Sequence, residues 1–203
     1  MSNLGWNELD KLRYSALSQV THETLSEKYV LLLATRVTEL CQDAYNLASS
    51  GRVASAPIIL RSALESYIDL VCVTKDEAHI DEMNRSFEKF KDEQEGRENK
   101  IRLKTIWRKF KIAGEKDAYN GLYAHLCRSS HGNIDSLVRD HADGENISVG
   151  HRPDEAEIEM LCKQSLLLSC HTLIVSLEHV GSANAALITL RKFQSRVSGR
   201  EDA

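Results

Sequence analysis

Three side chains able to contact or protonate a phosphate ester recur at three-residue spacing in YNGLYAHLCRSSHGNIDSL, residues 119–137: His125, Arg128 and His131. In a helix, this spacing gives a slowly drifting stripe toward the C-terminal end. An imidazole changes protonation near neutral pH, and a guanidinium is a permanent planar cation that suits phosphate oxygens. RNA cleavage without a metal requires these groups: the imidazole takes the proton of the ribose 2′-hydroxyl or protonates the leaving 5′-oxygen, and the guanidinium stabilises the charged phosphorane. DNA lacks that hydroxyl and would be spared.

The same two histidines also have a structural explanation. His131 directly precedes Gly132, where a cation or a hydrogen-bond donor stabilises the last carbonyl groups of a helix. His125 can simply complete a hydrogen bond in the core. A catalytic role and a packing role therefore stay open for both residues.

A second polar group interrupts an otherwise apolar helix, VASAPIILRSALESYIDLVCV at 53–73. Arg61, Glu65 and Asp69 stand four residues apart and share one face. An unpaired buried charge is costly, so Arg61 must be paired or hydrated. Either Arg61 pairs with Glu65 on the side of the helix that meets solvent, or the stripe lines a polar groove in which Arg61 binds an anion and Glu65 orients it.

Basic and aromatic residues are concentrated in NKIRLKTIWRKFK, residues 99–111. A helix of this kind can follow a phosphate backbone and stack a base. The candidate nucleic-acid contacts are Lys104, Trp107, Arg108 and Lys111. The alternative is a solvated helix on the rim of the protein, whose charge is balanced by the acidic segment DEQEGRE before it.

Neither a metal nor a cofactor is expected. The five cysteines contain no C-x-x-C pair and lie within apolar helical patterns, which is typical of reduced packing residues in a cytosolic protein. His141 and His151 flank two acidic residues in a loop, but nothing fixes their geometry as metal ligands. No G-x-x-x-x-G-K, G-x-G-x-x-G, H-E-x-x-H or G-x-S-x-G motif is present.

Composition indicates a soluble, cytoplasmic protein. Charged residues make up 28% and hydrophobic residues 42% of the chain, which is an ordinary globular balance. The formal net charge of -4 gives no general attraction to nucleic acid or anionic lipid, so such a partner would have to meet a local patch. The N-terminus lacks the apolar region of a secretory signal, and the most apolar run, 165–177, is too short and serine-rich to span a bilayer. No membrane association is expected.

The elements that must position these residues are helices. With two prolines and ten glycines, most of the chain shows uninterrupted helical periodicity. We predict an all-α single domain over 1–203, a bundle of four or five long helices with a charged helical excursion at about 75–113. The predicted helices are a peripheral one within 1–21, then 21–50 or 22–50, 55–74, 115–130, a short one at 134–139, 154–179 and 182–196, with a loop at 141–153 and a frayed tail at 197–203. The apolar surface of the last two helices suggests a homodimer.

The segments ILRSALESYIDL and YNGLYAHLCRSSHGNIDSL resemble a family of uncharacterised bacterial all-helical proteins that have an R-x-x-x-E helix and a later Y-x-x-L-x-x-x-x-H-G segment. Arg61, Glu65, Tyr123 and His131 match these motifs. That family distantly resembles the HEPN superfamily, which includes toxin and abortive-infection ribonucleases. HEPN ribonucleases carry an arginine followed four to six residues later by a histidine, acting across a dimer interface. Arg128 and His131 are closer than that, so this sequence departs from the hallmark spacing of the ribonucleases.

Two functions therefore compete. The first is an HEPN-like protein that binds RNA or a nucleotide, with a candidate activity as a metal-independent endoribonuclease of a toxin or phage-defence type. In it, Arg61, Arg128 and His131 contact phosphate, and His131 or His125 moves the proton. The second is a noncatalytic helical interaction or accessory module, an antitoxin-like or defence-system subunit with a protein partner, in which the same residues form a structural polar network.

Overall fold

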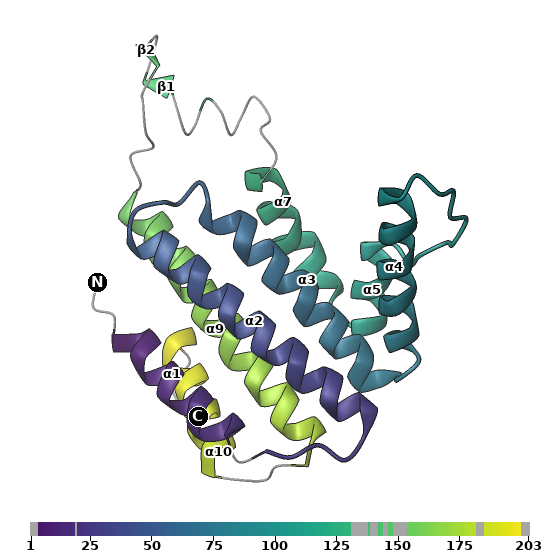
Figure 1. Ribbon diagram of the computed structural model, residues 1–203. Helices are drawn as coiled ribbons and strands as arrows, with labels where there is room; N and C mark the ends of the chain where they lie inside the picture. The colour runs from purple at the N-terminus through teal and green to yellow at the C-terminus, as the bar shows by residue number, and fades with distance from the viewer. Residues whose placement is uncertain are drawn as a thin grey trace.

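The fold is all-α, as the helical periodicity predicted (Figure 1). The computed structural model describes residues 4–18, 20–130, 138, 142–143, 146–147, 154–181 and 185–199. The long elements are α1 (Leu4–Leu17), α2 (Leu25–Ser49), α3 (Ala56–Lys75), α4 (His79–Gln94), α9 (Glu155–His179) and α10 (Ala185–Ser198). The short elements are α5 (Ile106–Ala113), α6 (Lys116–Ala118), a π-helical segment (Tyr119–Tyr123), α7 (Ala124–Ser130) and an antiparallel pair of two-residue strands, β1 (Ala142–Asp143) and β2 (Asn146–Ile147).

The core lies where α2 packs against both α3 and α9. α2 buries residues at helical spacing, among them Val30, Val37, Cys41 and Ala44, and this is the apolar stripe expected of a core-facing helix. α1 and α10 lie together on the α9 side of the bundle, whereas α4, α5 and α7 lie on the α3 side (Figure 1). The candidate residues on α3 and α7 therefore share one side of the molecule.

The start of α2 lies later than the sequence suggested. Thr24, and not Thr21 or His22, is the N-cap. The side chain of Thr24 accepts from the backbone N of Glu27 at 3.1 Å, and the Glu27 carboxylate accepts from the backbone N of Thr24 at 3.0 Å. This reciprocal capping box satisfies two of the backbone donors that a helix leaves unpaired, so it fixes the start of the helix at Leu25.

The charged excursion is helical at α4 and α5, but its basic segment is only partly helical. Residues 97–105 are not helical, and α5 begins at Ile106 behind an N-cap at Thr105. Asn99 and Lys104 contact Asp92 and Glu82, so this extended stretch runs back along α4. The prediction of one helix over 99–111 was therefore wrong for its first half.

The segment predicted as one helix over 115–130 is interrupted by a π-helical turn at Tyr119–Tyr123. A π-turn accommodates an extra residue within a helix, and such turns are frequent at functional sites. The rings of Tyr119 and Tyr123 stack at 5.3 Å across this turn. Periodicity alone does not reveal the interruption, because apolar residues continue at helical spacing on both sides of it.

α9 is long and apolar enough to cross a membrane by length and composition, but 67% of its most apolar window is buried inside the bundle. It is covered by α2, α10, α3 and α1, which makes it a core helix. Much of the apolar surface from which we predicted a homodimer is thus buried within the chain. The exposed Ile188 of α10 remains, and the homodimer stays a prediction.

Several features of the sequence lie outside the described residues. These are the candidate His131, the loop histidines His141 and His151, most of the predicted helix 134–139 and of the loop 141–153, and the tail beyond 199. The five cysteines are free thiols, and all except the half-buried Cys127 are buried. Burial raises the pKa of the Cys72 thiol to about 11, so this cysteine stays protonated at neutral pH.

Candidate functional site: a surface between α3 and α7

Arg61, Glu65 and Tyr123 meet where α7 and the π-helical turn run beside α3. The hydroxyl of Tyr123 donates to Oε1 of Glu65 at 2.9 Å, and Nε of Arg61 lies 3.5 Å from the same oxygen. The side chains of Arg61 and Glu65 are 27% and 38% exposed, so solvent reaches the pair. Burial of its ring, together with the hydrogen bond to Glu65 and the charge of that carboxylate, raises the pKa of Tyr123 above its usual range.

The contact between Arg61 and Glu65 is long, and Nε of Arg61 is shielded from water without donating a hydrogen bond. Within the part of the chain that the structure describes, the guanidinium donates no hydrogen bond to protein. Glu65 thus lies close enough to balance its charge, while its donors are not taken by any of the described residues. A guanidinium in this state can bind a phosphate oxygen without first breaking a bidentate ion pair.

The predicted stripe of Arg61, Glu65 and Asp69 is divided by the fold. Arg61 and Glu65 face Tyr123, whereas Asp69 contacts residues of the charged excursion. Arg61 does pair with Glu65 at i, i+4, and Tyr123 of the π-helical turn also contacts Glu65. The polar groove in which Arg61 binds an anion stays a prediction.

The remaining catalytic candidates lie on the neighbouring helix. His125 is half-buried and Arg128 is exposed, both on α7, and α7 packs against α3. The convergence of Arg61, Arg128 and His131 on one phosphate stays a prediction, because His131 is not among the described residues.

An aromatic ladder joins α5 to this surface; we use the name for Trp107, Tyr119 and Tyr123. The ring centroids of Trp107 and Tyr119 are 4.9 Å apart, and those of Tyr119 and Tyr123 are 5.3 Å apart. The fully buried Phe110 contacts both tyrosines and anchors the ladder to the core. Since Tyr123 also holds Glu65, the ladder connects the basic segment with the Arg61–Glu65 pair.

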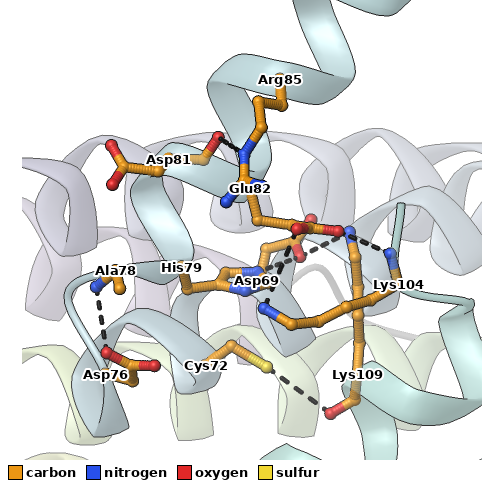
Figure 2. Close-up of polar contacts among 10 residues, drawn as sticks. All are labelled: Asp69, Cys72, Asp76, Ala78, His79, Asp81, Glu82, Arg85, Lys104 and Lys109. Carbon is orange, nitrogen blue, oxygen red and sulfur yellow. Dashed lines mark hydrogen bonds and ion pairs between the residues drawn. The ribbon is translucent and has the colours of Figure 1, made fainter. Parts of the chain in front are cut away.

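Sequence reasoning missed a largely buried group of charged residues around Asp69, which also includes His79 and Lys109 and which we call the Asp69 cluster (Figure 2). Oδ1 of Asp69 lies 2.8 Å from Nε2 of His79 and 2.8 Å from Nζ of Lys109, and the His79 side chain is only 2% exposed. Burial opposes ionisation of Asp69, but the hydrogen bond with His79 and the charge and hydrogen bond of Lys109 outweigh it and hold the pKa of Asp69 below its usual range.

A second acidic residue is neutralised beside this cluster. The buried Glu82 accepts from the backbone N of Lys104 at 2.5 Å, and Nζ of Lys104 lies 3.9 Å from its other oxygen (Figure 2). Lys104 and Lys109, two of the cations in the basic segment, thus point inward: Lys104 joins two parts of the charged excursion, and Lys109 fastens the excursion to α3 of the bundle. The available signal for the Asp69 cluster was a charged residue, Asp69, on an otherwise apolar helix. The spacing of residues in the sequence does not show which distant residues pair with it.

Among the described residues, no group of three or more His, Cys, Asp or Glu side chains could hold a metal ion. These residues therefore form no metal centre at this surface. Three surface hollows of about 300 to 430 Å³ are lined by residues of α1, α2, the α2–α3 turn, the start of α3, α9 and α10. Arg61, Glu65 and Tyr123 line none of the three. The side chains of Arg61 and Glu65 are reached by solvent, whereas Tyr123 is buried.

Comparison with known proteins gives a family and no further relative. A model for a family of unknown function (DUF5677) matches the chain over residues 27–82 and 74–148, which together cover more than half of it. The match includes Arg61, Glu65 and Tyr123. No curated protein and no solved structure matches. The chain therefore belongs to this family of unknown function (DUF5677).

Proposed function

We propose that this chain is an HEPN-like protein that binds RNA or a nucleotide through the surface between α3 and α7. The observation that supports it is the geometry around Arg61. Nε of Arg61 lies 3.5 Å from the Glu65 carboxylate, Tyr123 binds Glu65 from the other helix, and no described residue accepts a hydrogen bond from the guanidinium. A partly exposed, oriented guanidinium is the group that recognises phosphate best among protein side chains. The exposed Arg128 on α7 adds a second cation on the neighbouring helix.

A metal-independent endoribonuclease of a toxin or phage-defence type is the catalytic form of this proposal. Arg61 and Arg128 would stabilise the charged phosphorane, and His131 or the half-buried His125 would move the proton to or from the ribose and leaving oxygens. Cleavage by this route leaves a 2′,3′-cyclic phosphate and a 5′-hydroxyl, and it needs no added ion. A cytoplasmic location and a homodimer belong to the same proposal.

The second candidate is a noncatalytic interaction or accessory module, antitoxin-like or part of a defence system. It is favoured by the fact that Glu65 is held by two partners from its own chain, as in a structural network. In that case the α3–α7 surface would serve a protein partner, and RNA would not compete for it.

Direct RNA binding separates the two functions. We would measure fluorescence anisotropy of a labelled single-stranded RNA in the presence of EDTA, comparing the wild type with Arg61→Gln. The control is Arg36→Gln, which removes the same charge from an exposed position of α2. We expect Arg61→Gln to weaken binding about tenfold and the control to leave it unchanged. Equal affinities for the two variants would remove Arg61 from the proposed site, and no binding by the wild type would favour the accessory module.

A further inference from the structure

The two tryptophans of the chain lie in different environments. Trp107 is 39% exposed on α5, whereas the other tryptophan, Trp6, is 5% exposed in the core. The ring of Trp107 contacts Tyr119 at 4.9 Å with a tilt of 59°, so one part of the indole is held by protein and another part faces solvent. A ring that is fixed in place but open on one side loses little conformational entropy when a planar ligand stacks on it.

The charges around Trp107 separate into two groups. Lys104 and Lys109 point inward to Glu82 and Asp69, so they are already neutralised. Arg108 and Lys111 are exposed, next to Trp107 in sequence and one helical turn after it. Lys111 follows Trp107 by four residues and Arg108 by three, and side chains at these spacings are neighbours on a helix, so α5 presents an aromatic ring close to two cations.

We propose that Trp107, Arg108 and Lys111 form a subsite for an unpaired nucleobase and its neighbouring phosphates, which makes the ligand of this protein single-stranded RNA. This inference rests on the proposed function, and it adds the strandedness of the RNA and a second point of contact. Indole rings stack on the face of any base, while cations beside the ring bind the backbone. A base inside a duplex has no free face, so a duplex cannot use the subsite.

The aromatic ladder relates this subsite to the Arg61–Glu65 pair. Two ring contacts of about 5 Å lead from Trp107 through Tyr119 to Tyr123, whose hydroxyl binds Glu65. A base on Trp107 and a phosphate on Arg61 can thus belong to one short strand that follows the ladder. The competing explanation is that Trp107 only packs against Tyr119 at the edge of the core.

Intrinsic fluorescence tests the stacking directly, because Trp6 is the only other tryptophan. In a Trp6→Phe background, Trp107 is the single indole. We expect oligouridylate to quench its emission to a saturating level, with a dissociation constant equal to that from anisotropy, and an RNA duplex of the same length to leave the emission unchanged. Equal quenching by the duplex, or RNA binding without any quenching, would overturn the assignment.

Substitutions then distinguish stacking from packing. Trp107→Phe keeps an aromatic face and should bind single-stranded RNA nearly as well as the wild type, whereas Trp107→Leu should bind about tenfold more weakly. If packing were the only role of Trp107, both variants would lower the melting temperature and neither would change the affinity. The double variant Arg108→Gln/Lys111→Gln should reduce the slope of log affinity against log salt by about two, and Lys28→Gln/Arg36→Gln, an equal charge change at exposed positions of α2, should not.

The outcomes for this inference and for the proposed function are separable. Weaker binding by Trp107→Leu with normal binding by Arg61→Gln would support the subsite and remove the α3–α7 surface from RNA binding. The reverse pattern would overturn the subsite and leave the proposed function intact. A wild-type protein that binds no single-stranded RNA would overturn both.

Discussion

Nζ of Lys109 lies 2.8 Å from Oδ1 of Asp69, and this ion pair joins α5 to the C-terminal half of α3. The same oxygen is 2.8 Å from Nε2 of the buried His79 at the start of α4. One carboxylate on the bundle thus fastens both helices of the charged excursion. The backbone carbonyls of Ile112 and Ala113 are held as well, because Nζ of Lys75 donates to both.

Removing the charge of Asp69 should destabilise the protein. Asp69→Asn leaves the Lys109 ammonium and the His79 ring facing each other without the carboxylate between them. We expect the free energy of unfolding, measured by urea denaturation near neutral pH, to fall by about 1–3 kcal/mol. Asp43→Asn is the control, because Asp43 is exposed on α2; an equal loss in both variants would mean that the Asp69 cluster contributes nothing specific.

The contribution of Asp69 should also depend on pH in a defined direction. Its pKa in the folded protein is below the ordinary value of 3.8, so the unfolded state binds the proton more readily. The stabilisation is fully present above that ordinary value and is lost as the pH falls through the lower folded pKa. The difference in unfolding free energy between wild type and Asp69→Asn should therefore be constant from about pH 7 to pH 5 and shrink toward pH 2. A difference that grows on acidification would contradict this assignment.

The variant Tyr123→Phe tests the contribution of the Tyr123 hydroxyl separately from that of its ring. The ring contacts with Tyr119 and Phe110 are kept, but Glu65 loses its 2.9 Å hydrogen bond. We expect a loss of about 0.5–1.5 kcal/mol in unfolding free energy and weaker RNA binding, because Glu65 no longer holds Arg61 in one orientation. Tyr119→Phe is the matched control within the same ladder; a change in stability without a change in binding would restrict the network to a structural role.

Variants of His125 and His131 test the hypothesis that this protein cleaves RNA. His131→Ala should lower the rate of metal-independent RNA cleavage by about 10²–10⁴-fold while leaving the melting temperature nearly unchanged. His125→Ala tests the other proton-transfer candidate, and His22→Ala, at an exposed position before α2, serves as the control. Cleavage would be followed in EDTA by the appearance of cyclic-phosphate ends on a labelled oligonucleotide. If the wild type leaves RNA intact, the catalytic claim is lost and binding remains to be tested by itself.

The helices could be predicted well from the sequence because helical periodicity and capping depend on residues that are close together in the chain. Apolar residues at helical spacing mark α2, α3 and α9, and the acidic first turn after Asp154 marks the start of α9. The i, i+4 pair of Arg61 and Glu65 was predictable for the same reason.

The partners of Asp69 were not predictable in this way. His79 and Lys109 come from two other helices, and many charged residues at similar distances along the chain had equally suitable chemistry. The extended stretch before α5 was missed because Lys104 and its neighbours have good helix propensity, which the contacts with Glu82 and Asp92 override. Likewise, the sequence could not show that Lys104 and Lys109 point inward, so it overstated the number of cations that the basic segment 99–111 offers to a ligand.

The π-helical turn at Tyr119–Tyr123 sets the angular phase of everything that follows it on α7. In a regular α-helix each residue advances by about 100° around the axis. A π-turn holds more residues per turn than a regular α-helix, so it takes up one extra residue in about the same rotation. Deleting a single residue from the turn, such as Gly121, would let the helix close into regular geometry while His125 and Arg128 keep nearly their present direction. A residue deleted from the regular part of α7 would instead rotate the side chains after it by about 100° relative to Trp107, so the turn is where this helix tolerates a change of length.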